Sequence, residues 1–268
     1  MPLCDSMNIA YTPQMNLLYC GRLRLHKWDY TYMRVPYWRL YWNDRAGARF
    51  KDQDAAYHPI EPTHFTLVAP NTMLSRDLVR PVEHFYTHFT VGLPFARIQS
   101  CVHRFAAKPL LVEAMKRDYA RGDIFGKGAI RRSATALTLC WYALATLPSH
   151  LLHATEDNPR LNNMLKWWEA REWKPITNSE LAAMIAMHPT AFCRYFQRVM
   201  GYPPHTYGLV KRIDRACLLL HFSELSIKQI AGETGFCDRY YFSRKFRQLR
   251  GISPAAFRRQ YAAKQTGT

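Results

Sequence analysis

With 268 residues, of which 48% are hydrophobic and 14% aromatic, the chain has apolar material for two modest folded domains, which argues against an intrinsically disordered protein. The formal net charge of +17 favours an anionic partner, such as nucleic acid, an acidic membrane surface or a polyanionic substrate. The seven cysteines are scattered and form no C-x-x-C pair, so neither a disulfide framework nor a cysteine zinc site is indicated, and a reducing cytoplasm is expected.

The first part of the chain, to about residue 105, has the pattern of a β-rich module. Residues 37–42, 64–70 and 82–92 are aromatic and β-branched runs bounded by Gly, Pro and Asn, which predicts three strands. Helical patterns follow over residues 109–119 and 129–147. The second pattern is apolar nearly all round, which predicts a buried helix, with a partner subunit as one candidate for what covers it.

The same region holds the most apolar run of the sequence, residues 135–147, which is shorter than the ~20 residues that a membrane-spanning helix needs. The N-terminus has no basic stretch followed by an apolar one, as a secretion signal would have. We therefore expect no export and no membrane anchor.

Residues 153–160 (HATEDNPR) are polar, include a proline and separate two apolar helical patterns, which predicts a linker. Residues 1–159 hold 19 Lys/Arg and 13 Asp/Glu, and residues 160–268 hold 18 and 7, so the net charges are 19 − 13 = +6 and 18 − 7 = +11. The shorter part of the chain therefore carries most of the excess positive charge.

These patterns predict an α+β protein of two domains. The N-terminal domain is expected over residues 1–152, β-rich to about residue 105 and helical over about 106–152, and the C-terminal domain over residues 161–268 is expected to be all-helical.

Residues 177–207 and 226–257 form an internal repeat. At a constant offset of 242 − 192 = 50 residues, the pairs are Phe192 with Phe242, Arg194 with Arg244, Phe196 with Phe246, Gly201 with Gly251, Pro204 with Pro254, and Tyr207 with Phe257. Each copy opens with a capping-box pattern, Thr177-x-x-Glu180 or Ser226-x-x-Gln229, which predicts the start of a helix.

Each copy has the pattern of a helix-turn-helix motif, with a small residue at the turn (Ala186 or Gly235) and a second helix that begins near Pro189 or Asp238. Apolar residues recur in the second helices at spacings of four and seven residues, and they are expected to face the core. They are Phe192, Phe196 and Val199 in the first copy, and Phe242, Phe246 and Leu249 in the second.

The opposite stripe of each second helix is polar and largely basic. It consists of Thr190, Cys193, Arg194 and Gln197 in the first copy, and Arg239, Tyr240, Ser243, Arg244 and Arg247 in the second. A single basic stripe is usually a solvated face, but two copies in register, with capping boxes and a +11 charge, favour helices that lie in the major groove of DNA. Two alternatives stay open, an internal ion pair of Arg194 and a small buried thiol at Cys193.

The C-terminal sequence resembles the AraC/XylS family of bacterial transcription regulators over roughly residues 160–262. The segments that carry the resemblance are RIDRACLLL (212–220), SI (226–227), IA (230–231), GFCD (235–238), YFSRKF (241–246), GISP (251–254) and FR (257–258). In that family two helix-turn-helix motifs, joined by a long helix that would be about residues 204–222 here, insert their recognition helices into successive major-groove segments.

The resemblance implies specific contacts with DNA. Base-reading residues would be Thr190, Cys193, Arg194, Arg239, Tyr240, Ser243 and Arg244, and backbone contacts would be Gln197, Arg198, Lys245 and Arg247. Arg239 and Tyr240 replace small polar residues often seen in the family, so an operator sequence does not transfer from any relative.

The N-terminal region resembles the family's cupin-type effector-binding β-barrel followed by dimerisation helices, on its aromatic strand-like runs and the VAPNT segment (68–72). Such a barrel would hold a small-molecule effector, a sugar or an aromatic compound, against inward-facing rings. Candidate pocket residues are Trp38, Tyr41, Trp42, His64, His84, Tyr86 and His88.

Cupin enzymes bind metal through histidines, but His84 and His88 on one strand would lie about 13 Å apart, too far to bind one ion. His84 with His64 stays possible, whereas the G-x5-H-x-H pattern of metal cupins is missing from the sequence. We expect no metal and no cofactor.

The sequence therefore predicts a cytoplasmic, homodimeric transcription activator that binds operator DNA, contacts RNA polymerase, responds to a small-molecule effector and is not an enzyme. Two alternatives stay open: a regulator whose N-terminal domain only dimerises, and a cupin-type metalloenzyme fused to a DNA-binding module.

Overall fold

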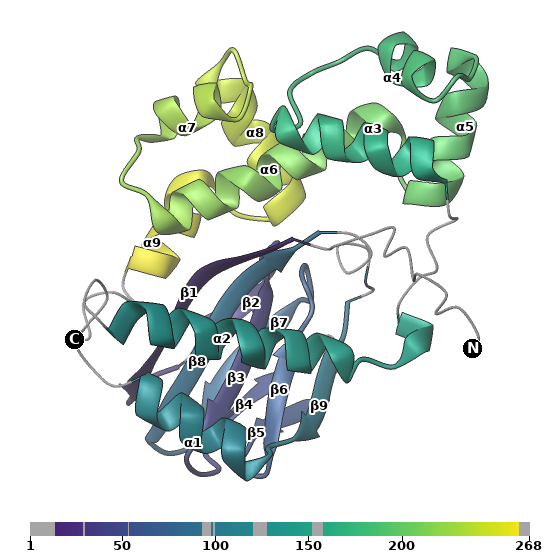
Figure 1. Ribbon diagram of the computed structural model, residues 1–268. Helices are drawn as coiled ribbons and strands as arrows, with labels where there is room; N and C mark the ends of the chain where they lie inside the picture. The colour runs from purple at the N-terminus through teal and green to yellow at the C-terminus, as the bar shows by residue number, and fades with distance from the viewer. Residues whose placement is uncertain are drawn as a thin grey trace, which may run out of the picture. The chain divides into compact units, whose positions relative to one another are not determined.

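The computed structural model describes residues 14–28, 30–52, 54–92, 98, 100–119, 128–151 and 158–262 (Figure 1). Contacts between residues group the chain into two compact units, residues 1–153 and 154–268. The first unit contains antiparallel sheets and the second contains helices, which confirms the predicted α+β fold class. Of the predicted linker, residues 153–157 lie outside the described part of the chain, and Asn158 is the N-cap of the next helix.

Two antiparallel sheets form the first unit, with strand orders β1-β8-β3-β6-β9 and β2-β7-β4-β5. The strands are β1 (Met15–Leu25), β2 (Tyr30–Met33), β3 (Trp38–Asn43), β4 (Ala48–Lys51), β5 (Tyr57–Ile60), β6 (His64–Val68), β7 (Leu74–Leu78), β8 (Val82–Val91) and β9 (Val102–Ala106). The three strands predicted from aromatic and β-branched runs are confirmed as β3, β6 and β8.

Strand β3 is buried over its whole length because both of its faces are covered. Trp38, Leu40 and Trp42 belong to a core that the five-stranded sheet shares with two helices. Tyr41 points the other way, into a second core between the two sheets. The alternation follows from the two-residue period of a strand, and it divides the candidate pocket residues between two layers.

Helices α1 (Pro109–Asp118) and α2 (Gly128–Ala145) lie across one face of the five-stranded sheet (Figure 1). Both confirm predicted helices, but the prediction that α2 is buried holds for one face only. That face includes Ala136, Leu139 and Leu144, whereas Ile130 is 82% and Trp141 37% exposed. A helix that packs on a sheet within its own chain buries only the side that faces the sheet, so the apolar residues on the opposite side of α2 keep part of their surface open to solvent.

Asp118 joins the end of α1 to α2. Its carboxylate accepts two hydrogen bonds of 2.8 Å from the Arg117 guanidinium and one of 2.6 Å from Thr135 Oγ1 on α2. The side chain is 2% exposed. The hydrogen bonds from Arg117, followed by the one from Thr135, outweigh the cost of burial and lower the pKa of Asp118 to about 2.

Asp118→Asn should lower the free energy of unfolding at pH 7 by about 1–2 kcal/mol, because a charged acceptor of three hydrogen bonds is lost. The folded pKa lies below the value in the unfolded chain, so this stabilisation is present above about pH 4 and is lost as the pH falls towards 2. Urea unfolding of both proteins at pH 7 and pH 3 should therefore give a smaller difference at pH 3. An unchanged difference would contradict the role of the ionised carboxylate.

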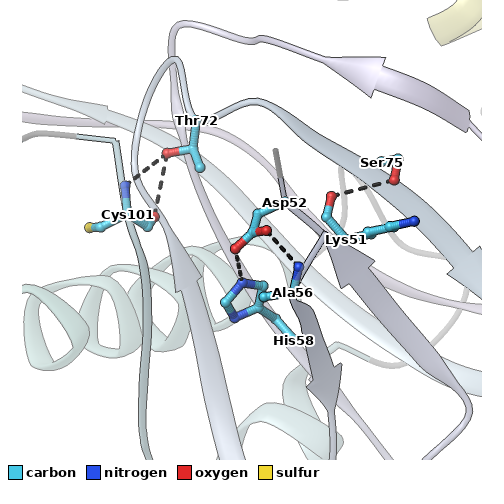
Figure 2. Close-up of polar contacts among 7 residues, drawn as sticks. All are labelled: Lys51, Asp52, Ala56, His58, Thr72, Ser75 and Cys101. Atoms are coloured by element: carbon cyan, nitrogen blue, oxygen red, sulfur yellow. Dashed lines mark hydrogen bonds and ion pairs between the residues drawn. The ribbon is translucent and has the colours of Figure 1, made fainter. Parts of the chain in front are cut away.

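Side-chain hydrogen bonds close the connection between β4 and β5 and join two segments that are far apart in the sequence (Figure 2). Asp52 accepts a 2.9 Å bond from the Ala56 amide and lies 2.7 Å from His58 Nε2, which ties β4 to β5. Thr72 Oγ1 accepts a 3.1 Å bond from the Cys101 amide, which ties the segment before β7 to the segment before β9. These contacts give His58 and Thr72 structural roles.

The second unit is built from seven helices among the residues that the structure describes. They are α3 (Pro159–Ala170), α4 (Asn178–Met184), α5 (Pro189–Met200), α6 (Pro204–Phe222), α7 (Ile227–Glu233), α8 (Arg239–Arg250) and α9 (Pro254–Ala262). None of the helices in the described part of the chain combines the length and apolar character that a bilayer crossing requires.

Candidate DNA-binding surface

The internal repeat folds as two similar helix pairs, α4–α5 and α7–α8. Both predicted capping boxes form, because the Thr177 and Ser226 hydroxyls accept from backbone amides three residues later and the Glu180 and Gln229 side chains accept in return. The turn residues Ala186 and Gly235 have φ values of +56° and +75°. Recognition helices α5 and α8 are both 12 residues long, as the constant offset of the repeat requires.

Each recognition helix is anchored by the predicted phenylalanines. Phe192 and Phe196 on α5, and Phe242 and Phe246 on α8, are 0% exposed. Val199 and Leu249, one turn further along, are partly buried. The helix phase inferred from spacing is therefore correct for the four aromatic anchors.

Helix α6 lies between the two helix pairs and holds both (Figure 1). At its N-terminal end, the Tyr207 ring packs edge-on against Phe196 of α5 at 5.4 Å. Further along, Arg212 Nη1 donates a 3.0 Å hydrogen bond to the Gly235 carbonyl, and its guanidinium lies 4.7 Å from the Phe236 ring centre. One helix therefore sets the positions of both motifs, and its bounds match the predicted range of 204–222.

A buried ion pair also joins α6 to α8. Arg250, the last residue of α8, donates from Nη2 to Asp214 Oδ1 on α6. Their side chains are 4% and 16% exposed. Because both charges are mostly removed from water, the pair restricts the position of α8 on the linking helix.

The predicted base-reading residues lie on the outer faces of α5 and α8. Thr190, Arg194, Arg239, Tyr240 and Arg244 are exposed, and Cys193 and Ser243 are partly buried. Of the predicted backbone contacts, Gln197, Arg198 and Arg247 are exposed, whereas Lys245 is partly buried and donates a 3.2 Å hydrogen bond to Gln248.

The structure bears on the two alternatives raised for α5, an internal ion pair of Arg194 and a small buried thiol at Cys193. Arg194 is exposed and forms no ion pair within the described residues. The Cys193 thiol is neither fully exposed nor fully buried.

The two recognition helices begin with different caps. Asp238 accepts hydrogen bonds from the Tyr240 and Tyr241 amides, at 3.1 and 2.7 Å, which lower the pKa of its carboxyl. His188 accepts a longer one, 3.4 Å, from the Thr190 amide through Nδ1. The N-terminus of α8 is therefore more firmly capped than that of α5. Helix α8 also carries more exposed cationic side chains than α5 does.

The candidate effector residues do not form one group. Tyr41, His84, Tyr86 and His88 gather between the sheets, where Tyr41 Oη lies 3.3 Å from His88 Nε2 and the Tyr41 and His84 rings stack at 5.0 Å. Trp38 and Trp42 do not belong with the other candidate effector residues, because strand alternation places them in the core under α1 and α2. His64 lies at the start of β6 with its ring beside Thr63 Oγ1, at 3.0 Å.

The space between the sheets contains residues that the sequence analysis missed. Trp28 and Phe50 pack against Tyr41 at 6.2 and 5.4 Å, and buried Arg76 lies 5.3 Å from the Trp28 ring centre. Arg39 is also buried and donates a 3.1 Å bond to the Thr72 carbonyl. The period-2 alternation of β3 could have shown that Arg39 and Tyr41 share a face, but not which layer that face meets.

The family model that matches this chain lies within its C-terminal unit. The model of a helix-turn-helix domain family matches residues 181–260. The HTH-type transcriptional regulator YdeC of Bacillus subtilis (strain 168) is 27% identical over 126 residues, 46% of this chain and 43% of that protein. The transcriptional activator RhaS of Mannheimia succiniciproducens is 33% identical over 104 residues, 39% of this chain and 38% of that protein. The chain thus spans less than half the length of these relatives.

Solved structures extend the likeness to the whole fold. ToxT from Vibrio cholerae has a TM-score of 0.57 at 14% identity, with 92% of this chain and 98% of that chain covered. ToxT from strain SCE256, with an unsaturated fatty acid bound, has a TM-score of 0.57 at 12% identity, with 90% and 95% covered. At such low identities the likeness shows a shared two-domain layout.

The identity of the C-terminal unit follows from three agreeing observations. Two helix-turn-helix motifs form an internal repeat, one long helix carries both, and the family model covers most of the repeat. In its C-terminal unit the chain therefore carries an AraC-type helix-turn-helix domain, of the kind found in transcriptional regulators.

Proposed function

We propose that the protein is a sequence-specific regulator that binds operator DNA through α5 and α8. The supporting observation is the pair of matched motifs on α6, each with phenylalanines toward the core and a polar, basic stripe toward solvent. Arginine suits guanine O6 and N7, and exposed cations suit phosphates. Because α6 holds both motifs, one chain covers two major-groove segments about 10 base pairs apart.

Selection of random duplex DNA on the full chain, at two salt concentrations, tests this proposal. We expect a bipartite motif with about 10 base pairs between its halves, and affinity that falls as salt rises. If the protein binds as a dimer, the selection should enrich two copies of this bipartite motif in one duplex. Weak binding with no enriched sequence at either salt concentration would indicate a basic surface that binds DNA without sequence preference. That result would contradict the proposal.

Arg244→Ala should weaken binding to the selected site by about 1–3 kcal/mol and relax the preference at one position, if the guanidinium reads a guanine. Titration of the selected duplex and of single-base variants measures both effects. Arg45→Ala, which removes an exposed arginine from the first unit, is the control for charge alone. Equal weakening on all sequences, with a shallower salt dependence, would instead make Arg244 a phosphate contact.

The first unit is proposed to bind a small-molecule effector and to form the homodimer. The aromatic and basic side chains between the sheets support an effector site, as does the fatty acid bound to the similarly folded ToxT. The exposed Ile130 and Trp141 on α2 support a dimer contact through that helix. The effector would bind one arrangement of the DNA-binding units more tightly than the other. It would thereby change operator binding or the contact with RNA polymerase.

Thermal unfolding of the full chain against sugars, aromatic acids, fatty acids and metal ions tests the effector. Stabilisation that rises with ligand concentration supports it. No stabilisation by any of these compounds favours a first unit that only dimerises.

A further inference from the structure

The second recognition helix exposes a large ring on its basic face. Tyr240 is 74% exposed, more than the exposed tyrosines Tyr57 and Tyr202, at 49% and 50%. It shares its face of α8 with Arg244 and Arg247, four and seven residues further along the helix. An aromatic ring therefore stands among cations at the N-terminal end of the helix proposed to enter the major groove.

Neighbouring groups hold this ring at the start of α8. The Asp238 carboxylate caps the helix through the Tyr240 and Tyr241 amides. The Arg239 guanidinium carbon lies 5.0 Å from the Tyr240 ring centre, and Arg239 Nη2 lies 3.5 Å from Tyr240 Oη. A guanidinium and an aromatic ring are thus presented together at the start of the helix.

The chemistry of the major groove identifies what this ring can recognise. The surrounding arginines favour a polyanionic partner, and in the major groove of DNA the C5-methyl group of thymine is the apolar group on a base edge. A ring edge that covers this methyl removes apolar surface from water, which contact with a phosphate does not do.

Building on the proposed function, we infer that Tyr240 reads the methyl group of a thymine next to a base that Arg239 reads. The first motif differs at the corresponding position, 240 − 50 = 190, where Thr190 stands. This shorter side chain has no ring to lay over a base. The ring contact therefore belongs to the α8 half of the site.

Replacement of thymine by deoxyuridine tests the inference with the full chain and the duplex that selection enriches. The exchange removes the methyl group and leaves the hydrogen-bonding edge of the base unchanged. At one position in the α8 half-site, it should weaken wild-type binding about fourfold, the effect of exposing one buried methyl-sized group. Each thymine is replaced in turn, so the position need not be known beforehand.

Two variants separate the ring from the hydroxyl group. Tyr240→Ala should bind the unmodified duplex more weakly and lose sensitivity to that one replacement, whereas the matched control Tyr240→Phe should keep it. Because the side chain is largely exposed, both variants should unfold at the wild-type temperature, which excludes misfolding as the cause.

Wild-type binding that tolerates deoxyuridine at every position overturns the inference, as does equal sensitivity of wild type and Tyr240→Ala at every position. In both cases the enriched motif would still support a DNA-binding regulator. If selection enriches no motif, the proposed function fails and the inference fails with it.

Discussion

Phe242→Ala should lower the free energy of unfolding of the C-terminal unit by about 3–5 kcal/mol. The Phe242 ring is fully buried, with ring centres 5.2 Å from Phe236 and 5.7 Å from Phe246. Truncation removes the middle ring of this row and leaves a cavity that the neighbouring rings fill only in part. Urea unfolding followed by far-UV circular dichroism measures the loss, and DNA binding should weaken because α8 is no longer held in place.

Two control variants sharpen this test. Ser243→Ala changes the next residue on the outer side of α8 and should alter stability by less than about 0.5 kcal/mol. Phe192→Ala, at the equivalent position of the first motif, should cost about as much as Phe242→Ala. A Phe242→Ala protein as stable as wild type would mean that a different side of α8 faces the core. The residues proposed to read DNA would then be assigned to the wrong side of the helix.

Asp214→Ala should destabilise the same unit by about 3–5 kcal/mol, since it removes the carboxylate that faces a buried guanidinium. Arg250 is held on the inner side of α8 with its side chain 4% exposed, so it cannot regain its hydration without moving the end of the recognition helix. Chemical unfolding measures the loss.

A double-mutant cycle separates the cost of a stranded charge from the value of the ion pair. Asp214→Leu combined with Arg250→Met replaces the pair by apolar side chains, and it should recover most of the stability lost in either single variant. Additive losses in the double variant would show that the two side chains stabilise the unit independently, and would remove the ion pair as the link between α6 and α8.

Much of the C-terminal unit was predictable because its information is local and repeated. A capping box uses residues only three apart, so Thr177 and Ser226 mark their helix starts without any tertiary contact. The spacing of Phe192 and Phe196, copied 50 residues later, sets the inner face of each recognition helix and hence the outer, solvent-exposed stripe that is proposed to contact DNA. The buried Asp214–Arg250 pair was not predictable, because its partners are 36 residues apart and no pattern joins them.

The N-terminal unit was predictable only in part. Strands β3, β6 and β8 were recognisable because they run through the middle of a sheet and are aromatic and β-branched. Edge strand β1 contains Gly21, and β7 contains Arg76 and Asp77, so neither has the continuous apolar run that identifies a buried strand.

By itself the sequence determined the fold class, the repeated helix-turn-helix motifs, the long helix between them and the side of each recognition helix that faces solvent. Only the tertiary structure decided which face of β3 meets the helices and which meets the second sheet. The two-residue period of a strand states that Trp38 and Trp42 share a side and that Arg39 and Tyr41 share the other, but both sides are buried here. Where both faces are covered, burial no longer distinguishes them, and the assignment depends on strand pairing between residues far apart in the chain.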